Sequence, residues 1–364
     1  MESTSSNAPQ TAGAAKRRRV DEPEDAVPPP YTPEKYKDMC FEDATILLHC
    51  LPSSIAFRVH RGVLAVHSEV FRDMFALAQP SDSGPENTLP VVHMHDDPEK
   101  LYRLLKYIYL HQLPDMSDAR YMDTLLDMLE PSIKYDVRRA RDDCLSALRA
   151  EFPDTLSKYH EAIETLLRRH LRGIAQCLRC VDVFTRHECW TLLPAVYASS
   201  AMFQIPPGTL HEIAPDYPSA RTMAAISLGK FKLQRLRLQT VHGFVRDVVQ
   251  QPAALHCGHK LARIFVNYMF LDNNVAGVDI TDPALMFQKN VPLAADVTPE
   301  ANQLCDQCRH VWRTAEKVGN ERAWMEMPAV FGLGTWEELR DKEAKAHPVQ
   351  PPVDTHVGAA HADT

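Results

Sequence analysis

Hydrophobic positions in the first third of the chain follow two periods, one typical of strands and one typical of helices. The runs ATILLHC at 44–50 and AFRVH at 56–60 predict two strands, and the alternation of Val92 and Met94 with polar neighbours predicts a third. The polar segment PSDSGPEN, which begins at Pro80, predicts a loop. We therefore expect a small sheet in this part of the chain.

Helices are predicted between and after these strands. Residues 61–66 predict a short helix, and Ser68 is then a good N-cap because its hydroxyl can accept a backbone N–H. Asp97 is predicted to cap another helix, with Pro98 in the first turn, where a missing N–H is tolerated. Apolar residues recur at helical spacing after both caps: Phe71, Met74 and Phe75, and then Leu101, Leu104, Leu105 and Ile108.

Helical spacing continues through the second half. A helix is predicted from about Ser132 to Leu148, with Pro131 starting it. Beyond Phe152 strand signals are sparse, so we expect an α-helical domain there. The helical stripes are Met122, Leu125, Leu126 and Leu129; Ala140, Cys144 and Leu148; Ile163, Leu167, Leu171 and Ile174; and Leu261, Phe265 and Met269.

Composition sets the outer limits of these predicted domains. Residues 1–30 hold many Ser, Ala, Pro and charged residues but almost no large apolar ones, so they cannot bury enough surface to offset their ordering entropy. The Pro-, Ala- and His-containing tail at 347–364 is predicted to be disordered as well. The predicted organisation is therefore a disordered tail at 1–30, an α+β domain at 31–152, an α-helical domain at 153–346 and a second tail at 347–364.

Charge and hydropathy exclude several classes of protein. The 364 residues carry a formal net charge of −8, which argues against a general surface for phosphate backbones. No apolar run approaches the roughly 18 residues that a membrane-spanning helix needs. The N-terminus lacks an apolar signal core, so we expect an intracellular protein of the nucleus or cytoplasm. Its 9 cysteines are then expected to be mostly buried, reduced thiols.

Several motifs, in the right order over residues 40–150, resemble the BTB/POZ family. The stretch FRVHRGVLAVHSEVFRDMF, from Phe57 to Phe75, is similar to the family signature of strand, helix and Ser-x-Val-Phe-x-x-Met-Phe. Downstream, VVHMHDDPEKLYRLLKYIYL resembles the third strand, the Asp-Asp-Pro cap and the helix of the family. The positions that fit the signature are Asp43, His60, Leu64, Ser68, Phe71, Met74, Phe75, Asp97, Leu104, Leu105 and Tyr107.

The resemblance implies the BTB/POZ fold, a small mixed sheet flanked by helices. It also implies surfaces for self-association and for partners such as cullin-type ubiquitin ligase scaffolds or transcriptional co-regulators. The dimeric members carry a long helix before the first strand, whereas only YTPEKYKDMCFED lies there, too short for that helix in full. The segments YHEAIE, LLPAVY and MPAVFGLGTWEEL are more diffusely similar to a large fungal group of BTB proteins, which implies a helical extension without a defined activity.

Two polar signature residues have a functional and a structural interpretation. His60 could contact a partner, or it could lie in a structural turn with its imidazole bonded to backbone. Asp43 could be an interface charge, or its carboxylate could fix the turn that enters the first strand. We favour the structural interpretation of both, and we expect the exposed parts of the neighbouring helices to form the recognition surface.

One group of cysteines is a candidate zinc site. Cys305-x-x-Cys308 is a possible half-site because this spacing lets two sulfurs reach one ion. Cys257 and His259 of the HCGH segment could supply the other half, and His310 is a further candidate. The alternative, which we favour, is that Cys305 and Cys308 lie one turn apart on a helix and face the core. No other cofactor is expected.

A second set of cysteines, Cys177 and Cys180 with His187 and Cys189, raises the same question. Its thiols interleave with apolar residues, so core packing is favoured.

Two basic stretches could be recognised by other macromolecules. Lys16, Arg17, Arg18 and Arg19 form a minimal nuclear-import signal or, alternatively, a solvated charge run. The second stretch contains Lys230, Lys232, Arg235, Arg237 and Arg246. Its interleaved leucines favour an amphipathic helix with a solvated basic face over a nucleic-acid site, because no base-reading module accompanies it.

Catalytic signals are missing from the sequence, which has no Gly-rich phosphate loop, no HExxH helix and no G-x-S-x-G turn. We therefore expect a non-enzymatic protein–protein interaction module that acts as an adaptor or regulator. One alternative is a substrate adaptor for a cullin-type ubiquitin ligase. Another is a nuclear transcriptional regulator with nucleic-acid contacts. The expected partners are other proteins, with self-association through the BTB domain possible and no membrane partner.

Overall fold

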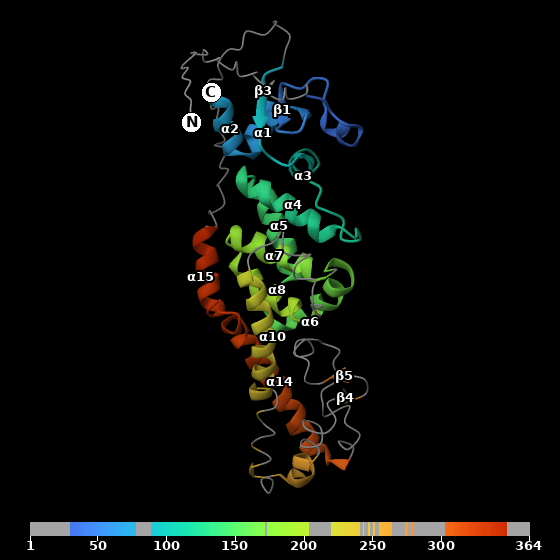
Figure 1. Ribbon diagram of the computed structural model, residues 1–364, viewed down its shortest axis with the longest axis vertical. Helices are drawn as coiled ribbons and strands as arrows, with labels where there is room; N and C mark the ends of the chain where they lie inside the picture. The colour runs from blue at the N-terminus through green and yellow to red at the C-terminus, as the bar shows by residue number, and fades with distance from the viewer. Residues whose placement is uncertain are drawn as a thin grey trace, which may run out of the picture. The chain divides into compact units, whose positions relative to one another are not determined.

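The computed structural model describes residues 30–77, 89–171, 173–203, 220–240, 255–263, 274–275, 278–279 and 303–347, with the single positions 243, 247, 250 and 251. These residues fall into two compact units. Figure 1 draws and labels their strands and helices. The sheet unit comprises the described residues of Met1–His60 and Gly84–Pro98. The helical unit comprises those of Arg61–Ser83 and Glu99–Thr364.

The sheet unit contains three strands and one short helix. Strand β1 lies in the centre, antiparallel to β2 and parallel to β3, so that the order is β2-β1-β3. Leu48 of β1 is paired with Phe57 on one side and with Val92 on the other. The predicted small mixed sheet is thereby confirmed. The elements are η1 (Glu34–Met39), β1 (Ile46–Cys50), β2 (Ile55–Val59) and β3 (Val91–Met94).

Helices make up most of the remaining described residues, which confirms the predicted helical second half. The first five are α1 (Arg61–His67), α2 (Glu69–Ala76), α3 (Pro98–Leu110), α4 (Tyr121–Lys134) and α5 (Arg138–Glu151). Those that follow are α6 (Leu156–Thr165), η2 (Leu166–His170), α7 (Ile174–Arg186), η3 (Trp190–Leu192), α8 (Leu193–Ser200), α10 (Ala220–Thr240), α14 (Asp306–Val330) and α15 (Trp336–Ala346). Two short strands, β4 (Asn274–Val275) and β5 (Val278–Asp279), form an antiparallel pair. Among the described helices, none is long and apolar enough to span a bilayer.

Ser68 joins α2 to the chain segment between α4 and α5. Its hydroxyl accepts the backbone N–H of Phe71 at 2.9 Å, so it caps α2 as predicted. The same hydroxyl donates to the carbonyl of Tyr135, whose ring stacks on Phe71 with 4.5 Å between ring centroids. Ser68 therefore both caps α2 and connects this helix to the segment between α4 and α5.

The predicted helix start at Pro131 was wrong. Pro131 lies inside α4, which continues to Lys134, and α5 begins only at Arg138. The proline removes one N–H, but its carbonyl still accepts the N–H of Tyr135 at 2.9 Å. The break comes instead at Asp136, whose φ of 45° is left-handed, a conformation that Asp tolerates better than most residues.

Hydrophobic residues predicted as single stripes in the second half are distributed over several elements. Ile163 lies on α6 and Ile174 begins α7, with the π-helix η2 between these helices. Leu261 is buried, whereas Phe265 and Met269 lie outside the described residues. A period alone therefore located apolar residues but not the boundaries between helices.

Aromatic residues connect the end of α14 to α15 and to the start of α6. The indoles of Trp324 and Trp336 are stacked 5.7 Å apart, and Trp336 donates its N–H to the carbonyl of Trp324 at 3.0 Å. Trp324 donates in turn to the carbonyl of Asp154 at 3.0 Å. Both indole N–H groups are thus satisfied while their rings are buried.

Candidate interaction surface

The apolar residues of the signature form a scaffold and offer little surface to a partner. Each is buried except Met74, which is half-buried. Side chains with no accessible surface can hold a fold but cannot contact another molecule. The buried members are Leu64, Phe71, Phe75, Leu104, Leu105 and Tyr107.

His60 and Asp43 bond to each other within the sheet unit. The imidazole Nε2 of His60 lies 3.1 Å from Oδ1 of Asp43, and its ring is 4.9 Å from that of Phe41. Asp43 lies in the turn before β1, as its structural interpretation requires, and its side chain is largely exposed. Nothing in a spacing of 17 positions predicts that the two side chains meet, so only the structure reveals this pair. Asp97 is also exposed and directly precedes α3.

Exposed apolar residues gather on two neighbouring parts of the helical unit. Val66, Val70 and Leu77 lie on or just after α1 and α2, and Val66 is 83% exposed. Leu110, Leu113 and Met116 lie at and after the end of α3. The rings of His67 and His111 are 5.8 Å apart, so the end of α1 lies next to the end of α3. We call these six residues and the two histidines the apolar surface.

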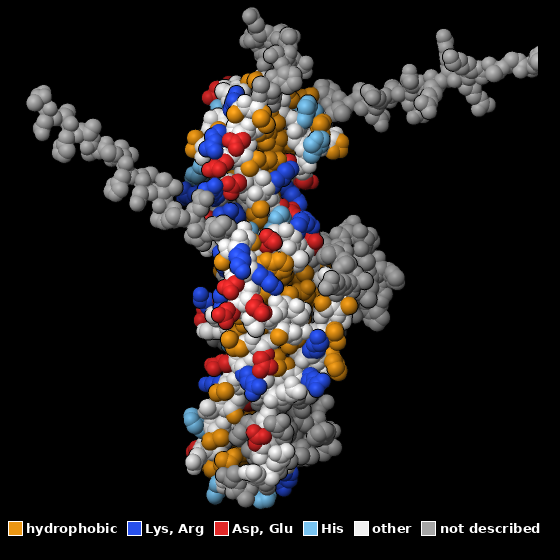
Figure 2. Space-filling model, turned by 90° about the vertical axis from the view of Figure 1, so that its left-hand side faces the viewer, with side chains coloured by type: hydrophobic (Ala, Val, Ile, Leu, Met, Phe, Trp, Pro, Cys, Tyr) orange, Lys and Arg blue, Asp and Glu red, His pale blue; other side chains and the backbone are white. Residues whose placement is uncertain are grey.

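One of the two histidines of the apolar surface, His67, has a lowered pKa. Partial burial lowers the pKa of His67, and the neighbouring His111 and Arg139 lower it further, because each disfavours a second positive charge. On the face drawn in Figure 2, hydrophobic side chains gather in patches between charged ones. Patches of this kind are typical of surfaces that bind other proteins.

Comparison with known protein families matches residues 35–151 to the BTB/POZ domain. Residues 35–151 are a BTB/POZ domain. The match covers the three-stranded sheet and the helices through α5, and it identifies the apolar surface as part of a protein–protein interaction module. The comparison with known families matched no catalytic family. No curated protein and no solved structure matched the chain.

The residues after the BTB domain lie outside this match. Their similarity to a fungal group of BTB proteins therefore stays a prediction. What the structure adds is that their helices are connected to the BTB helices by charged contacts. Arg179 of α7 donates to Asp123 at 2.6 Å and to Asp127 at 2.5 Å, both on α4. Burial alone would lower the pKa of Arg179, but Asp127 and Asp123 raise it, so the guanidinium is firmly charged.

A buried histidine makes a second connection to the BTB domain. His170, at the end of η2, is 1% exposed. Its Nδ1 lies 2.9 Å from the carboxylate of Glu151, and its Nε2 lies 3.1 Å from the carbonyl of Met116. Because a carbonyl only accepts, Nε2 carries the proton of that bond. Both partners belong to the BTB domain, so His170 holds the end of α5 and the loop before α4 together.

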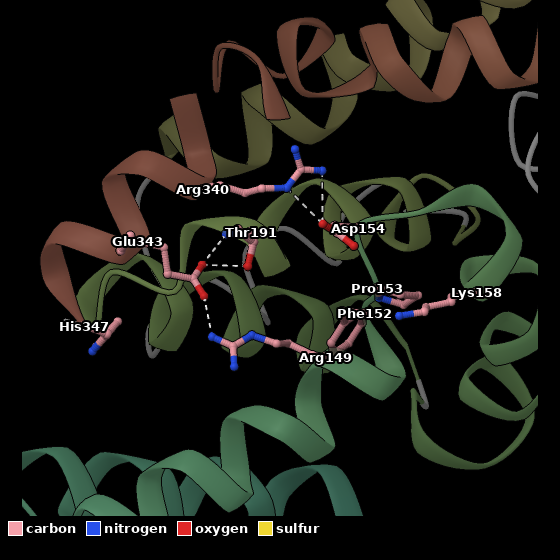
Figure 3. A pocket seen from close by; sticks show the side chains of 10 residues that line it. Arg149, Phe152, Pro153, Asp154, Lys158, Thr191, Arg340, Glu343 and His347 are labelled. Atoms are coloured by element: carbon pink, nitrogen blue, oxygen red, sulfur yellow. Dashed lines mark hydrogen bonds and ion pairs between the residues drawn. The ribbon is translucent and has the colours of Figure 1, made fainter. Parts of the chain in front are cut away.

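A pocket of about 370 Å³ lies beside α15, next to the end of the BTB domain (Figure 3). Glu343 accepts from Arg149 at 2.8 Å, and from the amide and hydroxyl of Thr191 at 2.6 and 2.7 Å. Arg340 pairs with Asp154 at 3.1 Å. These polar groups are engaged with one another across three segments of the chain, which is the arrangement of a structural junction.

Cysteines of the second candidate set are part of the core. Cys177 and Cys180 lie on α7, Cys189 lies just before η3, and all three are fully buried. Burial raises the pKa of Cys177 and of Cys189 to about 12, so both stay protonated thiols.

The first cysteine set converges in part. Ligand atoms of Cys257, Cys305 and His256 all lie within 4.8 Å of one another, and Cys308 is buried one turn into α14. His259 and His310, the histidines named from sequence, are exposed and do not belong to this group. The segment HCGH contains both His256 and His259, and sequence alone gave no reason to choose the first.

The basic stretches have different outcomes. Lys16, Arg17, Arg18 and Arg19 lie outside the described residues, as does Arg246. On α10, Lys232 and Arg235 are exposed while Leu233 and Leu236 are buried; Leu228 and Phe231 are exposed as well, so the solvated side of this helix is both basic and apolar.

Proposed function

We propose that this chain is a non-enzymatic adaptor whose BTB domain binds a partner protein through the apolar surface. One observation carries the proposal: the matched domain exposes apolar side chains on neighbouring elements, from Val66 on α1 to Leu110 on α3. Burying apolar surface stabilises a complex by about 25 cal/mol per Å², so these side chains are the natural contacts. The low charge of His67 near neutral pH favours the same use.

We favour a partner of different sequence over a second copy of the chain. The dimeric family members use a long helix before the first strand, and η1 is a 3₁₀ helix of 6 residues. Such a short element offers little surface for packing across a dimer interface.

An adaptor needs a second contact, and the helices α10 and α14 supply a candidate. They pack together and expose Leu228 and Phe231 on α10 and Val318 and Met325 on α14. This supports the alternative in which the BTB domain binds a cullin-type scaffold and the second half holds a substrate. In that role, the charged contacts of Arg179 would keep the two binding sites at a constant separation.

The proposal is tested by recovery of partners with a tagged full-length chain and its variants. Val66→Asp with Leu110→Asp places charge on the apolar surface, and we expect recovery of the BTB partner to fall at least roughly tenfold. Val318→Asp with Met325→Asp is the matched control, since it places the same charges outside the BTB domain and should leave that partner bound. The reverse pattern would refute the proposed site.

Further outcomes separate the rival functions. A cullin among the partners lost with Val66→Asp and Leu110→Asp would establish the ligase adaptor. A doubled mass in light scattering that the same variant halves would make the partner a second copy. Salt-sensitive DNA retention that is lost when Lys230, Lys232 and Arg235 are neutralised would favour the nucleic-acid regulator. Loss of nuclear localisation on changing Lys16–Arg19 to alanine tests the predicted import signal.

A further inference from the structure

Three thiols and an imidazole meet where α14 begins. Cys305 is the N-cap of α14, and the amide N–H of Cys305 donates to the sulfur of Cys257, 48 positions earlier, at 3.4 Å. Next to Cys257, Nδ1 of His256 lies 3.5 Å from the Cys257 sulfur. Cys308 is buried in the first turn of α14, three positions after Cys305. Three potential ligand atoms from two distant segments thus share one small volume, and Cys308 offers a fourth from the first turn of the same helix.

The distances suit a single tetrahedral ion. Zinc binds sulfur at about 2.3 Å and imidazole nitrogen at about 2.0 Å, so a tetrahedral site separates a nitrogen and a sulfur ligand by roughly 3.5 Å. The observed separation of His256 Nδ1 and Cys257 Sγ is 3.5 Å. The three ligand atoms of His256, Cys257 and Cys305 all lie within 4.8 Å of one another, so small side-chain rotations can bring them around one centre.

A backbone amide already points at one of the sulfurs, as amides do where thiolates are stabilised. The amide N–H of Cys305 donates to the sulfur of Cys257 at 3.4 Å. Such bonds around the ligands orient them and favour their negative charge. The N-terminus of the 25-residue helix α14 adds a positive field at the same place.

We propose that His256, Cys257, Cys305 and Cys308 bind one Zn²⁺ as a structural site. Three thiolates with one imidazole form a closed ligand set that is typical of structural zinc. On binding, the three thiols release their protons to solvent, and the site keeps a net charge of −1. Because Cys257 and Cys305 belong to distant segments, the ion fastens residues 255–263 to the start of α14. This role is independent of the proposed adaptor function.

The experiment uses the full-length chain, purified in reducing buffer and dialysed against a weak chelator, with bound zinc measured per chain. We expect one zinc per chain. His256→Gln should weaken zinc binding by roughly 10- to 100-fold or more, the range known for lesser disturbances of metal sites. His259→Gln is the matched control, because that exposed side chain lies two positions further on and should leave zinc unchanged. Both histidines are exposed, so neither variant is expected to unfold the chain.

A second measurement does not depend on folding of variants. Zinc is removed from the wild-type chain and replaced by Co²⁺, whose visible absorption reports tetrahedral thiolate coordination. The expected spectrum has a thiolate charge-transfer band, and its intensity saturates at one Co²⁺ per chain. Absence of stoichiometric zinc, equal loss in both histidine variants, or a Cys257–Cys305 disulfide in the freshly purified chain would each overturn the proposal.

Discussion

Two buried polar side chains of the helical unit, Glu343 and His170, meet partners from other parts of the sequence. Glu343 is 6% exposed and holds Arg149 and Thr191, which lie 194 and 152 positions away. His170 is likewise held by Glu151 and Met116. Buried charges persist only where such partners satisfy them. At the scale of the residue, these contacts favour one arrangement of the helices in this unit. Single substitutions can remove them one at a time.

Glu343→Gln is expected to destabilise the chain by about 1.5–3 kcal/mol, the usual contribution of hydrogen bonds to a charged group. The amide NH₂ of glutamine would face the donors of Arg149 or Thr191, so one contact is lost whichever way it turns. The free energy of unfolding from urea titration measures the effect. Glu337→Gln, on the exposed side of the same helix, is the control and should change stability by less than about 0.5 kcal/mol.

The stability of the helical unit should fall as the pH drops below about 6.5, in part because of His67. The folded chain holds the pKa of His67 below its ordinary value of 6.5, so the unfolded chain binds this proton more readily. The stabilising contribution is therefore complete above the unfolded pKa and is lost as the pH falls through the folded one. His67→Gln should flatten the dependence of the unfolding free energy on pH, because it removes the group whose pKa differs between the folded and unfolded chain. An unchanged slope in His67→Gln would contradict this assignment.

At the scale of the element, the contact between α10 and α14 depends on a residue without a side chain. Gly229 lies in the middle of α10, where glycine weakens a helix. A Cβ added there would overlap the ring of Phe331, which stacks on Tyr197 with 4.8 Å between ring centroids. Because the ring is held from its other side, it has little freedom to move away.

Gly229→Ala is thus expected to lower the thermal unfolding temperature, although alanine is the better helix former. Overpacking of this kind costs about 1–3 kcal/mol, whereas alanine gains about 1 kcal/mol in helix propensity. The cost of overpacking therefore at least offsets the gain. The double variant Gly229→Ala with Phe331→Leu separates the two effects, since the smaller side chain should recover part of the stability. If the single variant is more stable than wild type, the ring is not the constraint.

At the scale of the whole molecule, the BTB helices and the second half belong to one helical unit. Arg179 connects α7 to α4, and His170 connects η2 to the end of α5 and to the loop before α4. An adaptor with such connections presents its surfaces as one body. The helices after residue 152 therefore help to hold the BTB helices in place. Removing them is expected to destabilise the BTB helices as well.

His170→Ala should be severely destabilising, by about 3–5 kcal/mol, because it leaves the buried carboxylate of Glu151 without its imidazole partner. Urea unfolding followed by fluorescence and by circular dichroism measures this loss. We also expect the two signals to separate in the variant, as the second half detaches first. Adding Glu151→Gln should recover part of the loss, and a full loss in that double variant would contradict the electrostatic explanation.

Local chemistry made much of this structure predictable from sequence. Ser68 caps α2 because a hydroxyl before an apolar helical run satisfies a free amide. The strands β1 and β2 follow from short apolar runs, and β3 follows from alternation. The ordered motifs likewise sufficed to identify the BTB domain. These features depend on residues within a few positions of one another, so no knowledge of distant contacts was needed.

Only the tertiary structure decided which distant side chains meet. His60 with Asp43, Glu343 with Arg149, and His256 with Cys305 are pairings that no local period encodes. The helix break was likewise decided by the tertiary structure. The sequence placed it at Pro131, where one backbone hydrogen bond is lost, but the helix continues through Pro131 and breaks at Asp136. The sequence by itself determined the type of most elements and the presence of a BTB domain at residues 35–151, since these arise from short-range preferences. The sites arise from contacts across the chain, because chemistry between side chains depends on their distance in space.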